Sequence, residues 1–153
     1  MSNFSQINEA WKILSDPILR IQHLIQNELP KDLTVPSTNA IPKRLAPFFA
    51  VVANLLQTIS NLREKLQKTQ SNITKALLHT QLEESKNSIT STLTQLDELW
   101  IQCEGQLQSA QLNWETRTNE LWINLTTICS EMAYLQKWRS QLREAKLFLE
   151  QQL

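Results

Sequence analysis

The sequence predicts an all-α protein whose larger, C-terminal part is an antiparallel three-helix bundle. Gly occurs once and Leu and Gln are abundant, a composition that favours long helices over strands and tight hairpins. From Glu120 to Leu153, apolar residues recur at alternating spacings of four and three, which places them on one stripe of a helix. The stripe consists of Leu121, Leu125, Ile128, Met132, Leu135, Leu142 and Leu149. Two similar stripes upstream are its simplest cover.

The chain begins with two short helices over residues 1–27. Ile7, Ala10, Trp11 and Leu14 share one helical face, and Ser15-Asp16-Pro17 then interrupts the pattern. Pro is tolerated in the first turn of a helix, and Asp16 is placed to cap the exposed amides. We therefore expect a helix, a stop and a new helix that fades near Asn27.

Residues 28–47 read as a linker, because Pro30, Pro36, Pro42 and Pro47 stand among Ser and Thr residues. The bundle then occupies residues 48–153, with helices expected at about 48–79, 81–116 and 119–152. The turns are placed in two polar clusters, at His79-Thr80 and Thr116–Asn119, since these positions give helices of similar length. Ser71-Asn72 and Gly105 are rival turn sites. One very long helix in a coiled coil also satisfies the periodicity.

The charge pattern argues against several classes of partner. The formal net charge is zero and no Lys/Arg block occurs, so a basic footprint for nucleic acid or an anionic membrane is absent. No secretory signal pattern opens the sequence, and no apolar run is long enough to span a bilayer. These features lead us to expect a soluble, cytoplasmic protein.

The sequence gives no sign of an enzyme, and we expect no cofactor and no metal site. His23 and His79 stand alone, and no Gly-rich loop is present to hold a phosphate. Cys103 and Cys129 have neither zinc-site nor redox-motif spacing. Each lies on or beside an apolar stripe, so we expect two buried thiols.

Aromatic and apolar residues beside the main stripes are the candidate binding residues. Tyr134 and Trp138 lie four apart on the last helix, and Phe49, Ala53 and Leu56 form a similar side stripe on the first bundle helix. Such flanking positions are often half-buried in a bundle. Alternatively, they form an exposed apolar patch with aromatic anchors for a partner.

The segment Ile7-Asn8-Glu9-Ala10-Trp11-Lys12-Ile13-Leu14-Ser15-Asp16-Pro17 resembles the end of a J-domain. Its continuation, Ile18-Leu19-Arg20 and then His23-Leu24-Ile25, resembles the HscB type, a J-type co-chaperone of iron–sulfur cluster assembly. In that family a connector leads to a three-helix bundle. Residues 121–139, from Leu121-Trp122 to Trp138-Arg139, are similar to its last bundle helix, and Phe48-Phe49 matches the start of its first.

This resemblance implies a non-enzymatic co-chaperone that binds an IscU-type cluster scaffold protein through its bundle, for delivery to a DnaK/HscA-type chaperone. The scaffold-binding positions of the family match Phe49, Ala53 and Tyr134, whereas its acidic residues are replaced by Asn54 and Gln57. The His-Pro-Asp motif that stimulates the chaperone ATPase is absent.

Two further expectations concern the start of the chain and its role. Either Ile7, Trp11 and Leu14 pack on the bundle, or Met1 is an internal Met of a longer reading frame. The alternative to a co-chaperone is a structural helical-bundle or coiled-coil protein that oligomerises or binds another protein.

Overall fold

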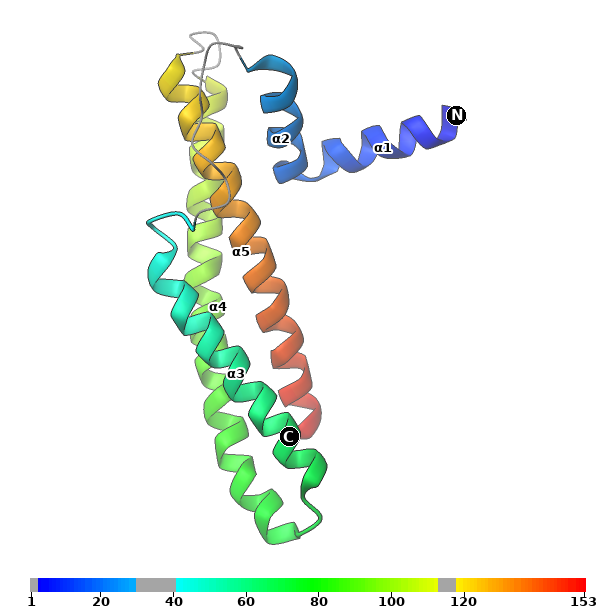
Figure 1. Ribbon diagram of the computed structural model, residues 1–153, viewed down its shortest axis with the longest axis vertical. Helices are drawn as coiled ribbons and strands as arrows, with labels where there is room; N and C mark the ends of the chain where they lie inside the picture. Colours follow the sequence, from blue (N-terminus) through cyan, green and yellow to red (C-terminus); the bar gives the residue numbers. More distant parts are fainter. Residues whose placement is uncertain (1–2, 30–40, 113–117) are drawn as a thin grey trace. The chain divides into compact units, whose positions relative to one another are not determined.

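A computed structural model describes residues 3–29, 41–112 and 118–153, which contain five α-helices and no strand (Figure 1). The helices are α1 (Asn3–Ser15), α2 (Pro17–Glu28), α3 (Ala46–Lys68), α4 (Asn72–Leu112) and α5 (Asn119–Gln152). The predicted all-α class is therefore confirmed. The chain divides into two compact units, which we call the first unit (Met1–Pro42 and Gln102–Tyr134) and the second unit (Lys43–Ile101 and Leu135–Leu153).

The break between α1 and α2 coincides with the Asp16-Pro17 step expected from the sequence. Asp16 has extended backbone angles, and its Oδ1 accepts hydrogen bonds from the backbone amides of Ile18 at 2.8 Å and Leu19 at 3.2 Å. Pro17 occupies the first turn of α2, where its missing N–H leaves no helix bond unmade. The Asp16 side chain and the Pro17 ring thus both favour a helix start at this point.

The two N-terminal helices differ in how their apolar faces are covered. On α2, Ile18 and Ile21 are 5% and 6% exposed within the first unit, and the Cys129 thiol of α5 donates to the Ile18 carbonyl at 3.9 Å. On α1, Ile7 and Trp11 are 67% and 71% exposed. The expectation that these residues pack on the bundle is therefore not met for Ile7 and Trp11, and the side chain of Leu14 lies outside the described residues.

The Pro-containing segment ends where α3 begins. Pro30 and Pro36 lie outside the described residues, and Pro42 stands ahead of a short turn. Leu45 is fully buried at the N-cap of α3, and Pro47 occupies the first helical turn. Helix α3 thus starts close to the predicted end of the linker.

The turn between α3 and α4 differs from the preferred prediction. Helix α3 ends at Lys68, Thr69 is extended with φ −91° and ψ 126°, and α4 begins at Asn72. The Ser71 carbonyl accepts from Lys75 N at 3.1 Å. The chain thus turns over residues 69–71, beside the rival site Ser71-Asn72. The expected turn at His79-Thr80 is wrong, since both residues lie inside α4.

The three bundle helices also differ in length, although helices of similar length were expected. Helix α3 has 23 residues, α4 has 41 and α5 has 34. Gly105, the other rival, lies inside α4. Helix α5 coincides with the expected range 119–152, and the Thr118 hydroxyl caps it by accepting from Leu121 N at 3.2 Å. Thr116 and Arg117, part of the predicted second turn, lie outside the described residues.

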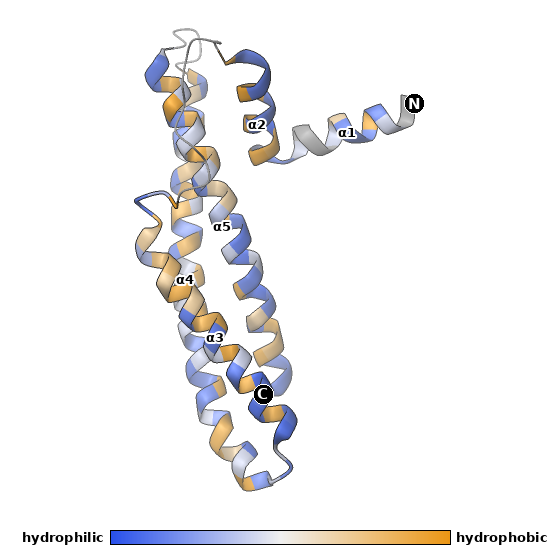
Figure 2. Ribbon diagram, viewed as in Figure 1, coloured by the Kyte–Doolittle hydropathy of each residue, from blue (hydrophilic) through white to orange (hydrophobic). Residues whose placement is uncertain are grey.

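Each unit has buried apolar residues drawn from several helices. Figure 2 shows hydrophobic residues interspersed with hydrophilic ones along these helices. In the second unit the core consists of Leu45, Val52, Ile59, Leu62, Leu78, Leu82, Ile89, Leu93, Leu96, Leu135, Trp138, Leu142, Ala145 and Leu149. In the first unit it consists of Ile18, Ile21, Cys103, Leu121, Trp122, Leu125, Ile128, Cys129 and Met132. The stripe predicted along α5 is buried throughout and contributes to both cores.

Candidate interaction surface

Helix α3 presents the predicted side stripe of Phe49, Ala53 and Leu56 in the second unit. Phe49 is 50% exposed, Ala53 is exposed and Leu56 is half-buried. The buried residues of α3 are Val52, Ile59 and Leu62. Val52 is three residues from Phe49 and Ile59 is three residues from Leu56, so the buried face adjoins the stripe. The stripe therefore lies at the border between the core and the solvent, where an apolar contact is available to a partner.

The two aromatic residues predicted on α5 have different environments. Tyr134, the last residue of its segment in the first unit, is half-buried. Trp138, in the second unit, is only 5% exposed. Trp138 is thus a core residue in this structure, whereas the sequence left open a half-buried position and an exposed anchor.

The periodicity of α5 explains the burial of Trp138. Leu135, Trp138, Leu142, Ala145 and Leu149 are all buried and follow one another at spacings of three and four. The predicted stripe runs from Leu135 directly to Leu142 and contains no residue between them. Trp138 lies three residues after Leu135 and four before Leu142, so the same spacing rule predicts its burial.

A set of charged side chains joins α4 and α5 in the second unit. Arg139 Nε donates to Asp97 Oδ1 at 2.7 Å, and Arg143 Nη2 lies 3.5 Å from the same oxygen. The Arg139 guanidinium also lies 4.7 Å from the centroid of the Trp100 ring. These contacts link α4 to α5. No local pattern in the sequence predicts them, because Asp97 and Arg139 lie far apart along the chain.

Both thiols are buried in the first unit, as expected from the sequence. Cys103 Sγ donates to the Glu131 carboxylate at 3.5 Å, and burial raises the pKa of the Cys129 thiol above its ordinary value of 9.0. A hydrogen bond with Gln22 lowers the pKa of Cys129 in part, and the Asp16 charge raises it further. Among the described residues, no group of three or more His, Cys, Asp and Glu side chains is arranged to hold a metal ion.

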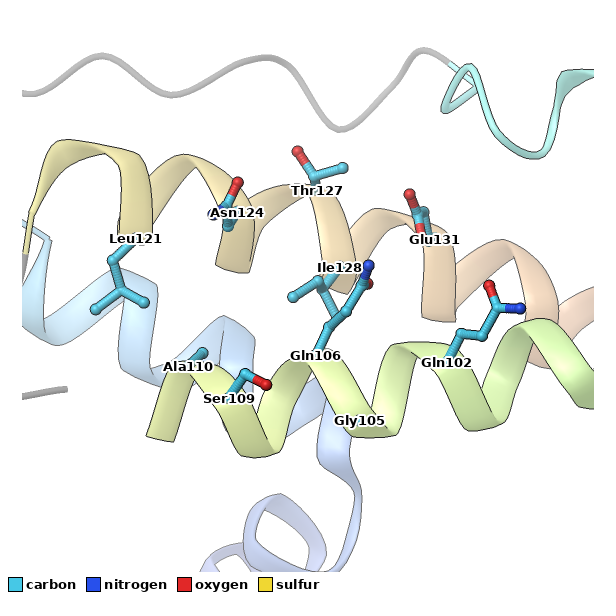
Figure 3. A pocket seen from close by; sticks show the side chains of 10 residues that line it. All are labelled: Gln102, Gly105, Gln106, Ser109, Ala110, Leu121, Asn124, Thr127, Ile128 and Glu131. Carbon is cyan, nitrogen blue, oxygen red and sulfur yellow. The ribbon is translucent and has the colours of Figure 1, made fainter. Parts of the chain in front are cut away.

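A polar groove of about 590 Å³ lies between α4 and α5 in the first unit (Figure 3). Gln102, Gln106 and Ser109 come from α4, and Asn124, Thr127 and Glu131 from α5, over an apolar floor that includes Ile128. Of the lining residues Glu131 is the charged one, and it is 6% exposed. The polar side chains of this lining can form hydrogen bonds with a ligand, and they do not pair a nucleophile with a general base. No pattern in the sequence predicts the groove, because these polar residues are typical of any solvent-exposed helix face.

None of the helices in the described ranges is long and apolar enough to cross a bilayer. Comparisons of the chain with known proteins found no matching family model, no similar curated protein and no similar solved structure.

Proposed function

We propose that this protein is a non-enzymatic helical co-chaperone of the HscB type, which binds an IscU-type iron–sulfur scaffold protein. In this proposal α1 and α2 are the end of a J-domain, and α3, α4 and α5 supply an antiparallel three-helix scaffold-binding bundle. The role would place the protein in the cytoplasm, beside a DnaK/HscA-type chaperone.

The α1–Asp16–Pro17–α2 segment is the observation that carries the proposal. Its sequence resembles the end of a J-domain over Ile7 to Pro17. The structure has two helices separated at this step, and Asp16 caps the second one through two backbone amides. The residues that carry the resemblance are therefore also the residues that create the helix–stop–helix geometry.

The α3 side stripe is the proposed docking face for the scaffold protein. Phe49 offers a half-exposed aromatic ring, and Ala53 and Leu56 extend its apolar surface along the helix. A partly exposed aromatic residue beside small apolar neighbours is typical of an interface anchor. Asn54 and Gln57 are exposed near the stripe, so recognition would rely on apolar contact and neutral hydrogen bonds more than on charge. Tyr134, in the other unit, is proposed as a separate contact.

Titration of the purified protein with an IscU-type scaffold protein by calorimetry tests the proposal. Phe49→Ser and Tyr134→Ala should each weaken binding by about tenfold or more, the loss expected for an interface anchor. Ile101→Ser is the matched control for Phe49→Ser, because Ile101 is 65% exposed on α4 and lies outside the stripe. Circular dichroism establishes that all three variants remain helical.

Two results of this titration would contradict the proposal. Absence of binding by the wild-type protein would refute the scaffold-binding role, and unchanged affinity of Phe49→Ser would refute the α3 docking face. A chaperone ATPase assay adds a second expectation. The chain has no His-Pro-Asp tripeptide, so it should bind the scaffold protein without stimulating the ATPase.

Self-association is the second candidate function, favoured by an uncovered apolar pair on α4. Ile73 and Leu77 are 76% and 68% exposed and lie four residues apart on one helical face. In this alternative the protein is a structural helical-bundle or coiled-coil protein that oligomerises through such faces. Sedimentation equilibrium distinguishes the two, since a monomer over the whole concentration range supports the co-chaperone and a dimer that Leu77→Ser dissociates supports the alternative.

A further inference from the structure

A second groove in the first unit, which we call the α2 groove, lies between α2 and the facing parts of α4 and α5. It has a volume of about 360 Å³, within the range of small-ligand sites in proteins. Ile21 and Leu125 form its buried floor, with exposed fractions of 6% and 4%. Leu24, Leu107 and Ala110 are half-buried along its sides. The groove is thus mainly aliphatic and is open to solvent.

The groove follows from the way α2 packs in this unit. Ile18 and Ile21 in the first half of the helix are buried, whereas Leu24 and Ile25 in the second half are only half-buried. One of the α4 residues that line the groove is the small Ala110, whose methyl group occupies less of this space than a longer side chain would. An aliphatic surface therefore remains accessible beside a well-packed helix turn.

One cationic group stands at this aliphatic surface. Arg20 lines the groove, and its backbone amide is fixed in the first turn of α2 by a 2.9 Å hydrogen bond to the Asp16 carbonyl. Among the described residues, the Arg20 side chain makes no ion pair. An exposed arginine that lines an aliphatic groove complements a ligand with an apolar chain and a terminal carboxylate.

We propose that the α2 groove binds an aliphatic monocarboxylate, with the chain against Ile21, Leu107 and Leu125 and the carboxylate beside Arg20. The affinity should then rise with each methylene added to the ligand, until the chain fills the groove. The charge should contribute less than the chain, because Arg20 is exposed and water screens the ion pair.

Calorimetric titration with hexanoate, octanoate and decanoate, each below its micelle concentration, tests the apolar part. Each added methylene should lower Kd by about fourfold until the groove is full. Ala110→Phe should abolish binding because the ring occupies the groove. Ala133→Phe is the matched control, since Ala133 is exposed on α5 and does not line the groove. Wild-type affinity in Ala110→Phe would overturn the proposal, as would the absence of binding by any of the three acids.

Comparison of octanoate with 1-octanol tests the proposed contact between Arg20 and the ligand carboxylate. Arg20→Gln should raise the Kd of octanoate by up to about fivefold and leave that of octanol unchanged. Equal effects on both ligands would refute the assigned role of Arg20. Should Ala110→Phe fail to fold, nuclear Overhauser effects from the terminal methyl of octanoate decide the site in the wild-type protein. Contacts with the methyl groups of Leu24, Leu107 and Leu125 support the α2 groove, and contacts elsewhere contradict it.

Discussion

Asp97 of α4 and Arg139 of α5 form a direct, charged hydrogen bond of 2.7 Å in the second unit. The Arg139 side chain is 17% exposed and that of Asp97 is 44% exposed, so the contact is only partly shielded from water. Arg139 also lies over the Trp100 ring. The pair therefore combines a modest ion pair with a cation–π contact on one guanidinium.

Asp97→Asn should lower the free energy of unfolding by about 1 kcal/mol, because the variant keeps the shape of the side chain and loses its charge. Urea denaturation at low and high salt measures the effect, which should shrink as salt screens the wild-type pair. Glu98→Gln removes the same charge from the next residue, which is exposed, and should be nearly neutral. Equal losses in the two variants would contradict a specific Asp97–Arg139 contribution.

Trp138→Ala should cost about 3–5 kcal/mol of stability, because it empties a buried position of the second unit. Phe49→Ala, at a ring that is 50% exposed, should cost about 1 kcal/mol or less. Thermal and urea unfolding of both variants checks this order. A Trp138 variant as stable as the Phe49 variant would mean that the tryptophan is not a core residue.

Asp16→Ala should destabilise α2 by about 1 kcal/mol, since two backbone amides lose their acceptor. Asp16→Asn is the control that retains a good capping oxygen, and it should lose much less. Hydrogen exchange of the amides of α2, compared with those of α3, shows whether the loss is local. Uniform acceleration in both helices would contradict a capping role.

The Cys129 thiol should make stability depend on pH in the alkaline range. Its pKa is raised above 9.0 by burial, so the native state holds the proton more tightly than the unfolded chain does. The stabilisation is complete below the unfolded pKa and is lost as pH rises through the folded one. Urea unfolding at about pH 8 and about pH 10 should show a larger decrease for wild type than for Cys129→Ala. Equal decreases would refute the assignment, and Cys103→Ala serves as the second-thiol control.

Local signals in the sequence account for the elements that were predicted well. The break at Asp16-Pro17 is predicted by a helix-capping residue followed by a proline. The range of α5 is predicted by an apolar stripe that is continuous along the chain. The prediction of the α3–α4 turn at His79-Thr80 is wrong because it depends on nearly equal helix lengths, which α3 and α4 do not have. The contacts of Asp97 with Arg139, and the exposure of Ile7 and Trp11, depend on packing between distant segments. Periodicity carries no information on such contacts.

Gly105→Ala should stabilise the protein by about 0.5–1 kcal/mol, because Gly is the poorer helix former and loses more backbone freedom on folding. Gly105 lies in the interior of α4, and an added Cβ would meet no atom within 4 Å. The new methyl group would project into the open polar groove of Figure 3 without displacing a neighbour. Thermal unfolding measures the gain, with Ser109→Ala as a comparison that changes another groove residue but leaves the glycine in place. A loss of stability in Gly105→Ala would instead indicate that α4 bends or ends at this residue, as the rival turn assignment supposed.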